Sequence, residues 1–278
     1  MSTTFLSVGH FCYDVSPNGY ILGGSASYST LTAQNLGYCA RAVTAVGANF
    51  DRQTPLLDGI ETVYHTSADT TIFDNRYDEN GYRQQFILGA ARRLKGADIP
   101  TEWHDSDIAY LCPIADEVSA EVVHCFSEDT LIGATPQGWL RQWDTDGKVE
   151  AKRWETAKDI LPYIDVLILS DEDIRPYPDE LDRYIELAPI VVLTQGGRGA
   201  TFFQNGTQLG SEAYAVREVD PTGAGDVFAA AFLINYYQNR SVEDALNFAH
   251  CVASFAVEGI GTSHIPKLSQ VMARLHSV

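Results

Sequence analysis

Positive charge is scarce in this chain: 19 Lys and Arg stand against 37 Asp and Glu in 278 residues, which gives a formal net charge of −18. Binding to nucleic acid depends on clustered Lys and Arg that neutralise phosphates, and anionic membrane surfaces attract the same kind of basic segment. We therefore expect neither nucleic acid nor a membrane as a partner. A small nucleotide is not excluded, because backbone N–H groups and a few local positive side chains can hold its phosphates.

Cysteine is also sparse, and long apolar runs are absent. The five cysteines are scattered, with no C-x-x-C pair and no metal-ligand spacing with histidine, so we interpret them as reduced core thiols of a cytoplasmic protein. No stretch approaches the roughly 18 apolar residues of a membrane span. Residues 1–10 lack the basic and apolar regions of a secretory signal. Secretion and membrane insertion are therefore not expected.

What the chain does contain is a regular alternation of short apolar runs and helical patterns. The runs predict strands buried on both faces, at residues 5–8, 42–46, 108–112, 131–134, 166–169 and 190–193. Helices are predicted at residues 25–36, 116–126, 155–163, 178–187, 224–237 and 242–257. This alternation is typical of an α/β fold with a doubly wound, mainly parallel sheet. With 45% hydrophobic residues and no obvious linker, residues 1–278 are expected to form one domain.

Residues 70–88 break this rhythm with a strand, a turn and a second strand. Asn80-Gly81 in the turn is a strong hairpin signal. Together with the polar, tyrosine-bearing segment 11–21, this hairpin is expected to form a small β sheet from about residues 11–22 and 68–90. A lid over a site at the strand ends and a merely decorative hairpin are both open. The exposed edge could also pair with a second copy, so a homodimer stays open.

A second Asn-Gly pair, Asn205-Gly206, predicts an ordinary hairpin turn at the edge of the main sheet.

Residues 218–233 combine a strand end, a glycine-rich turn and a long helix of small residues. Gly223, Ala224 and Gly225 let a phosphate approach the free N–H groups of the first helical turn, which is a favourable anion site. Asp226 in that turn would repel a resting phosphate. It is better suited to take a proton from a hydroxyl that attacks the transferring phosphoryl. The structural alternative treats the glycines as turn formers and Asp226 as a first-turn acid favoured by the helix dipole.

The run Asp-Pro-Thr-Gly-Ala-Gly-Asp at residues 220–226 resembles the C-terminal signature of the ribokinase and phosphofructokinase-B carbohydrate kinases. Near the N-terminus, the runs at residues 8–14 and 22–27 are similar to that family's sugar-binding segment. The resemblance implies that Asp14, Gly23 and Gly24 contact hydroxyls of the acceptor. An acceptor-only carboxylate and an exposed Gly-Gly backbone suit a polyol; the structural alternatives are a loop acid and a turn.

Two further segments resemble the family's nucleotide-binding parts. The run Val-Leu-Thr-Gln-Gly-Gly-Arg-Gly-Ala at residues 192–200 implies a donor role for Thr194, Gly196, Gly197 and Gly199. It matches neither the dinucleotide fingerprint nor the P-loop.

The helix at residues 247–257 and the loop at residues 259–262 resemble the adenine side of the family's site. The resemblance puts His250 beside the base, although a packed core histidine remains the structural alternative. The loop could also join Asp220 and Thr222 in a site for a monovalent cation such as K⁺, as in several relatives.

Two segments depart from the family pattern. Where many relatives carry N-x-x-E for Mg²⁺ and phosphate, this chain has Ser-Asp-Glu-Asp, so Ser170 and Asp173 are the implied donor-side residues, with Asp173 holding Mg²⁺ through water. A helix cap followed by first-turn acids explains the same string. At residues 135–141 the family's D-P-N-x-R is also altered, which leaves Gln137 and Arg141 as open contributors.

The resemblance extends over essentially the whole chain. It implies a Mg²⁺- and ATP-dependent kinase that phosphorylates a hydroxyl of a sugar or cyclitol, most similar to the myo-inositol kinase branch. Two alternatives stay open: a nucleoside kinase of the same fold, and a non-catalytic nucleotide or sugar sensor. The altered pair Ser170 and Asp173 keeps the sensor in consideration.

Overall fold

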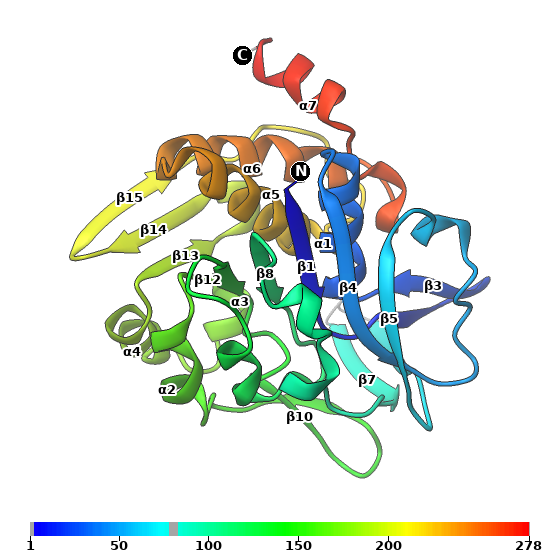
Figure 1. The fold of residues 1–278 in the computed structure, drawn as a ribbon. Helices are drawn as coiled ribbons and strands as arrows, with labels where there is room; N and C mark the ends of the chain where they lie inside the picture. Colours follow the sequence, from blue (N-terminus) through cyan, green and yellow to red (C-terminus); the bar gives the residue numbers. More distant parts are fainter. Residues whose placement is uncertain (1–2, 78–82, 278) are drawn as a thin grey trace.

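The computed structural model describes residues 3–77 and 83–277, and one large sheet forms its centre (Figure 1). The strands of this sheet are β1 (Thr4–Val8), β4 (Cys39–Val46), β5 (Glu61–Thr66), β8 (Ile108–Leu111), β9 (Leu131–Ala134), β12 (Val166–Ser170), β13 (Ile190–Thr194), β14 (Ala200–Gln204) and β15 (Thr207–Ser211). Their spatial order is β15-β14-β13-β12-β9-β8-β1-β4-β5. The strands from β13 to β5 run parallel, and the β14–β15 hairpin at one edge is antiparallel.

Helices cover both faces of this sheet. The helices of the described residues are α1 (Ser25–Asn35), α2 (Ala157–Ile160), α3 (Asp171–Ile174), α4 (Glu180–Leu187), α5 (Ala224–Asn239), α6 (Val242–Ala256) and α7 (Leu268–Leu275). Helices α1, α5 and α6 pack on the face that carries Phe5 and Tyr110, whereas α2 and α4 pack on the face that carries Leu6 and Leu111. Successive residues of one strand thus enter opposite hydrophobic layers. The predicted doubly wound, mainly parallel α/β fold is confirmed.

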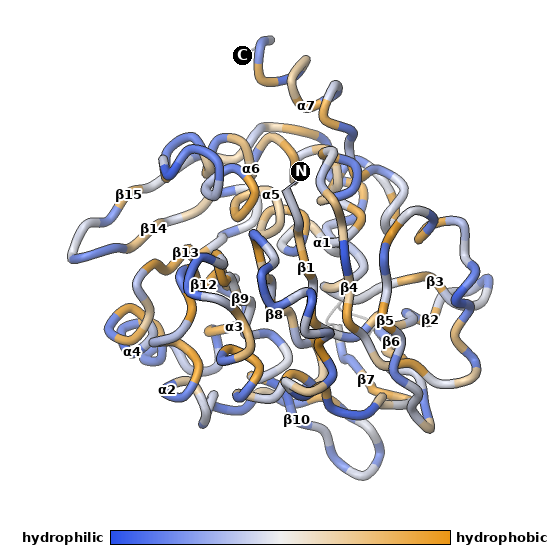
Figure 2. The backbone as a smooth tube through the Cα atoms, in the orientation of Figure 1, coloured by the Kyte–Doolittle hydropathy of each residue, from blue (hydrophilic) through white to orange (hydrophobic). Residues whose placement is uncertain are grey.

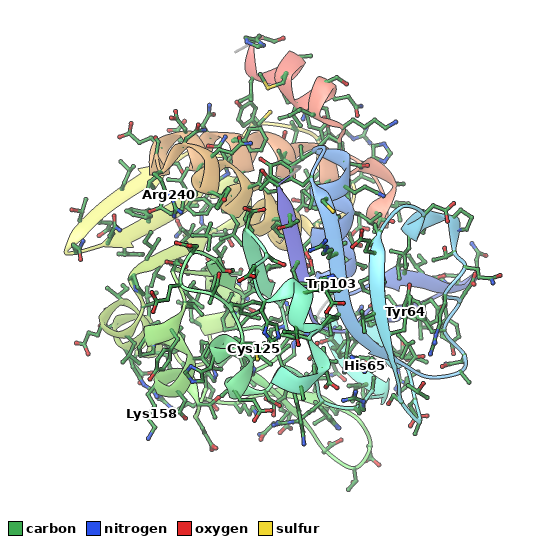
Figure 3. All side chains as sticks on the ribbon, viewed as in Figure 1. Tyr64, His65, Trp103, Cys125, Lys158 and Arg240 are labelled. Atoms are coloured by element: carbon green, nitrogen blue, oxygen red, sulfur yellow. The ribbon has the colours of Figure 1, made fainter. Side chains whose placement is uncertain are left out.

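The hydrophobic pattern follows these layers. Figure 2 shows hydrophobic colour along the inner strands and a hydrophilic turn at the tip of the β14–β15 hairpin. At the opposite edge, β5 still has two covered faces: Tyr64 packs on Phe11 and Phe50, and His65 on the other face reaches the carbonyl of Asp98 at 2.9 Å (Figure 3). No helix of residues 3–77 and 83–277 has both the length and the apolar character needed to cross a membrane.

A separate small sheet, here called the lid sheet, lies beside the main sheet. Its strands are β2 (Cys12–Ser16), β3 (Gly19–Gly23), β6 (Thr71–Tyr77) and β7 (Arg83–Gly89), in the spatial order β3-β2-β6-β7. The predicted small sheet is therefore confirmed, while the turn predicted at Asn80-Gly81 lies outside the described residues. A two-stranded ribbon of β10 (Arg141–Trp143) and β11 (Val149–Ala151) follows, and the bridge between Phe86 and Lys148 joins it to the lid sheet.

Most predicted helices are present, but the one predicted at residues 116–126 is wrong. Only a 3₁₀ turn at Ala120–His124 forms there. Val118 instead pairs with Leu94 in an isolated β bridge, and Asp116 adopts a left-handed φ of 56°, so the first half of the segment cannot be helical. The segment at residues 155–163 is helical over a shorter length, as α2 and a 3₁₀ turn at Leu161–Tyr163.

The second Asn-Gly hairpin is confirmed. Strands β14 and β15 pair across it, and Asn205 and Gly206 have φ values of 50° and 76°. Positive φ at both central residues is the requirement of a type I′ turn, which asparagine and glycine meet at low strain. Strand β5, the ribbon β10–β11 and helix α7 were not predicted.

Candidate active site

Helices α1 and α5 begin side by side, and each begins after a glycine with positive φ. Gly24 has φ 94° and Gly223 has φ 77°, and neither glycine caps its helix with a side chain. A Cβ added to Gly223 would lie 2.2 Å from the ring of Tyr28, so the α5 turn packs directly on α1. The first N–H groups of an uncapped helix are free to bind an anion. The fold therefore brings two such helix ends to one place.

A cavity of about 600 Å³ opens at this place. Residues that follow β9, β12 and β13 line it, in agreement with the rule that ligands bind at the carboxyl ends of parallel strands. The sequence-predicted residues found in its lining are Asp14, Gly24, Ser170, Asp173, Thr194, Gly196, Gly197, Gly199, Asp220, Thr222, Gly223, Ala224, Gly225, Asp226 and His250. Gly23 lies beneath Asp14 instead, since a Cβ there would approach the Asp14 Oδ2 to 2.1 Å.

Asp226 lies where the two helix ends meet. Burial, together with the nearby carboxylate of Asp173, raises the pKa of its carboxyl from 3.8 to about 6. A hydrogen bond from the Ser25 side chain and the positive charge of Arg141 act in the opposite direction. A carboxyl with a pKa near 6 is still mostly ionised at neutral pH and accepts a proton more readily than an exposed one.

Ser170 and Asp173 form the helix cap that the sequence allowed. The Ser170 Oγ accepts the N–H of Glu172 at 3.1 Å, and the Ser170 N–H donates to the Asp173 Oδ2 at 2.9 Å. Both residues nevertheless line the cavity. Burial raises the pKa of the Asp173 carboxyl, although Arg141 and the Ser170 N–H oppose this. The capping interpretation and a role facing the donor are thus compatible.

The acidic residues fit a hydrated divalent cation rather than a caged one. No cluster of three or more His, Cys, Asp or Glu with metal-ligand geometry exists in residues 3–77 and 83–277. The Asp173 carboxylate raises the pKa of Asp226 and so disfavours its ionisation, which a divalent cation would relieve. Mg²⁺ keeps several waters and binds through one or two carboxylates plus phosphates, so this pair suits it.

The glycines after β13 differ in what they permit. A Cβ at Gly196 or Gly197 would meet no atom within 4 Å, so the backbone there is open to a ligand. Gly199, with φ 101°, is a packing glycine, because a Cβ there would lie 1.9 Å from the carbonyl oxygen of Ser211. Thr194 at the strand end donates to the carbonyl of Leu169 at 3.3 Å.

His250 on α6 is both packed and in contact with the cavity. Its Nε2 lies 2.9 Å from the Ser211 Oγ, and the edge of the Phe228 ring meets it at a centroid distance of 5.0 Å. Burial lowers the pKa of His250 from 6.5 to about 4, so the imidazole is neutral at physiological pH. A neutral ring suits a contact with an uncharged base better than a contact with phosphate.

The loop before α5 is pinned by Asp220. Its Oδ1 accepts the N–H of Thr222 at 3.0 Å, and its Oδ2 accepts the N–H of Gly261 at 3.1 Å. Asp220 and Thr222 therefore lie together at the cavity, while their role in a monovalent cation site stays a prediction.

Arg141, left open by the sequence, lies in the cavity with Gln137. The Arg141 Nη1 donates to the carbonyl of Ile114 at 3.2 Å, and its guanidinium stands over the Phe73 ring at 5.6 Å. It is a positive group that acts on both Asp173 and Asp226. The only sequence signal for Arg141 was its place in the altered family segment at residues 135–141.

Of the residues that the lid sheet presents to the cavity, the sequence singled out Asp14 but not the others. Asn75 and Gln85 line it from the directly paired strands β6 and β7, and the Gln85 Nε2 donates to the Asn75 Oδ1 at 3.0 Å. On β2, Cys12 and Asp14 face the cavity two residues apart. The period of two along a strand could have indicated these positions once the inward face was known.

Known proteins resemble this chain along most of its length. A nucleoside kinase of Methanocaldococcus jannaschii is 23% identical over 269 residues, which cover 91% of this chain and 85% of the relative. An inositol 3-kinase of Arabidopsis thaliana is 24% identical over 278 residues, which cover 96% of this chain and 76% of the relative.

The fold is shared with solved kinases. A pyrophosphate-dependent myo-inositol-1 kinase, converted into a myo-inositol-3 kinase by two substitutions, superposes with a TM-score of 0.80 at 19% identity and covers 98% of this chain and 99% of its own. Residues 140–268, which include the α5 turn, match the family model described as pfkB family carbohydrate kinase. The whole chain therefore has the ribokinase-like fold, and its match to the pfkB carbohydrate kinase family lies in residues 140–268.

Proposed function

We propose that this kinase transfers the terminal phosphoryl group of Mg²⁺-bound ATP to a hydroxyl of a cyclitol or sugar. The observation that carries the proposal is the polar wall that the lid sheet presents to the cavity that holds Asp226. Asp14, Asn75 and Gln85 supply carboxylate and amide groups there. A carboxylate only accepts hydrogen bonds, whereas each amide both donates and accepts, and such a mixture matches a ring of hydroxyls.

The apolar surface on the acceptor side is small. Phe73 and Ile114 belong to the lining, but each is 3% exposed, and the guanidinium of Arg141 stands over the Phe73 ring. A nucleobase is normally held by apolar and aromatic contacts with a few polar groups. The acceptor side therefore favours a polyol. A nucleoside acceptor is the second candidate, since the nucleoside kinase of Methanocaldococcus jannaschii is similar in sequence.

Asp226 is the general base of the proposed reaction. The acceptor hydroxyl forms a new P–O bond, its proton passes to the Asp226 carboxylate, and the bond to the donor's remaining phosphates breaks with the electron pair on the leaving oxygen. The N–H groups of Gly223 and Gly225 stabilise the charge on the transferring phosphoryl, while the Ala224 N–H donates to the Pro221 carbonyl at 3.1 Å. Asp173 would hold Mg²⁺, and the ion would supply positive charge that neutralises the donor's phosphates. Coverage by the lid sheet keeps water, the competing nucleophile, away.

The donor side favours a nucleotide over pyrophosphate. Beyond the phosphate turn the cavity continues along a wall of small apolar residues with the neutral His250 beside it; these are Ala213, Val216, Ala253 and Val257. An apolar wall binds a base but contributes nothing to pyrophosphate. Pyrophosphate is the second donor to test, because the similar myo-inositol kinase structure is pyrophosphate-dependent.

The test is a matrix of acceptors and donors. Purified protein is supplied with Mg²⁺ and either ATP or pyrophosphate, together with myo-inositol, other cyclitols, sugars or nucleosides. We expect acceptor-dependent ADP release with a polyol, and Asp226→Asn serves as the matched inactive control. Phosphorylation of nucleosides alone would overturn the acceptor assignment, and turnover with pyrophosphate alone would overturn the donor assignment. Binding without any turnover would identify a sensor.

A further inference from the structure

Glu117 is a buried acid that the proposed reaction does not use. Its side chain is 1% exposed, and its carboxylate accepts three backbone N–H groups. The N–H of His10 lies 2.9 Å from Oε1, that of Ile114 lies 2.9 Å from Oε2, and that of Ala115 lies 2.7 Å from Oε2. Burial of a carboxylate is unfavourable unless such contacts compensate it. The contacts join two loops that are more than one hundred residues apart in the sequence.

His10 passes the connection on to the lid sheet. Its Nε2 lies 2.9 Å from the carbonyl of Arg92, which can only accept, so Nε2 carries the proton. Nδ1 is then an acceptor and receives the hydroxyl of Thr71 at 2.8 Å. The Thr71 Oγ1 in turn accepts the N–H of Ala91 at 3.0 Å. Every polar atom of this chain of contacts thus has a partner.

All four crossings between the lid sheet and the main body meet at this network. The chain enters β2 just after His10, enters β6 at Thr71, and leaves β7 just before Ala91. It leaves β3 through Gly24, where an added Cβ would lie 2.6 Å from the His10 carbonyl oxygen. The network therefore forms the root of the lid sheet.

The same network reaches the cavity on both sides. From His10, strand β2 continues to Asp14, and from Thr71, strand β6 continues to Asn75. From Ile114, whose N–H Glu117 holds, the carbonyl accepts Arg141, and Arg141 lowers the pKa of the catalytic candidate Asp226. A shift of this root would change the distance between the acceptor wall and the base.

We propose that Glu117 is a positioning residue which, through His10 and Thr71, sets the lid sheet at the distance from Asp226 that the acceptor requires. The proposal rests on the proposed function, in which the acceptor lies between the lid sheet and Asp226. A purely structural Glu117 would change stability and leave the balance between acceptor KM and kcat untouched. A positioning Glu117 changes that balance even at temperatures where the variant is fully folded.

Two variants and two controls separate these roles. Glu117→Gln keeps the shape but turns one oxygen into an NH₂ group that faces backbone N–H groups. Thr71→Val removes only the hydroxyl that links His10 to the lid sheet, whereas Thr71→Ser retains it. Thr130→Val deletes a comparable hydroxyl, on a residue that is 6% exposed, which contacts the Ser127 hydroxyl just before β9 begins, whereas the cavity lies after β9 ends.

The first readout is steady-state kinetics with the acceptor found for the wild type. For Glu117→Gln and Thr71→Val we expect the acceptor KM to rise by about ten- to hundredfold, because small misplacements of a binding wall have effects of this size. The donor Kd should stay within about twofold, since the donor turn is held by separate contacts. Thr71→Ser and Thr130→Val should keep the wild-type acceptor KM.

The second readout is amide hydrogen exchange, which needs no turnover. In Glu117→Gln and Thr71→Val we expect exchange to accelerate at residues 12–16 and 71–76, while the main sheet keeps its protection. Unchanged exchange in those strands would overturn the proposal. So would a loss of protection that is spread evenly over the whole protein and matches the pattern seen in Thr130→Val. If Glu117→Gln does not fold, the Thr71 pair decides. A wild type that phosphorylates no acceptor refutes the proposed function alone, since the exchange result still stands.

Discussion

The two sides of the cavity are constructed in different ways. The phosphoryl side consists of short contiguous segments, at residues 170–173, 196–199 and 220–226, each held by contacts within itself or with one neighbour. The acceptor side consists of single side chains on paired strands of the lid sheet, which draw on residues 12–23 and 71–89. The functional groups of a contiguous segment stay together because they are close in sequence. The acceptor wall, in contrast, forms only if strands that are distant in sequence pair in one register. Substitutions on the two sides should therefore fail in different ways.

Asp226→Asn should show the largest effect and should confine it to turnover. Loss of a positioned base lowers kcat on the order of 10²–10⁴-fold. Burial raises the pKa of Asp226 from 3.8 to about 6, so ionisation of this carboxyl destabilises the folded state. The stability that the protonated acid contributes is therefore lost as pH rises through about 6. The amide variant should hence melt at the wild-type temperature or above it at pH 7. Calorimetry beside a kinetic assay checks both; near-normal turnover in a folded variant would remove Asp226 from its role.

Asp14→Ala should break the acceptor side alone. A lost hydrogen bond to a charged group corresponds to roughly 1.5–3 kcal/mol, or about ten- to hundredfold in kcat/KM for the acceptor. Asp14 lies on β2 of the lid sheet and not on the turn after β13, so the donor Kd measured by titration calorimetry should not change. Equal losses for acceptor and donor would mean that the two sides are not independent.

The same contrast explains what the sequence could predict. The function of the turn before α5 could be predicted because glycines, small residues and an acid within seven positions already define an anion site with a base. The parallel sheet could be predicted because its strands are continuous apolar runs. Asn75 and Gln85 were not, since nothing local distinguishes an inward polar residue of a small sheet from an outward one. The helix predicted at residues 116–126 failed because Glu117 engages distant loops, a long-range contact that helical propensity does not encode.

The pH dependence of turnover sharpens the assignment of the base. With the pKa of Asp226 at about 6, the carboxylate is ionised at neutral pH and protonated in acid, so kcat should fall below pH 6 by about tenfold per pH unit. Arg141 lowers this pKa, and Arg141→Gln should move the inflection to higher pH. The measurement is kcat at saturating acceptor and donor from pH 5 to 8. An inflection that stays in place in Arg141→Gln would contradict the electrostatic coupling.

Asn75→Ala tests whether the inward face of the lid sheet reads the acceptor. Loss of one neutral hydrogen bond, about 0.5–1.5 kcal/mol, should raise the acceptor KM roughly two- to tenfold. Asp74 is the matched control, because it is the next residue on the same strand, points the other way and pairs with Arg76. Asp74→Ala should leave the acceptor KM unchanged. If both variants raise the acceptor KM equally, the change results from disturbing strand β6 as a whole and not from losing a contact on its cavity-facing side.

His250→Asn should have the smallest effect and should distinguish the donors. The imidazole packs against Phe228 and lines the apolar end of the cavity, so its loss should raise the KM for ATP by about two- to fivefold and leave any use of pyrophosphate unaltered. Burial lowers the pKa of His250 from 6.5 to about 4, so the ring stays neutral in the folded protein from pH 5 to 8. The pH dependence of ATP affinity over that range should therefore be the same in His250→Asn and in the wild type.

The unfolded chain takes up that proton near 6.5, so this histidine's contribution to stability is complete above pH 6.5 and is lost as pH falls toward 4. Thermal melting from pH 4 to 7 should therefore be less pH-dependent in His250→Asn than in the wild type. A donor KM that rises equally for ATP and pyrophosphate would place His250 at the phosphates rather than at the base.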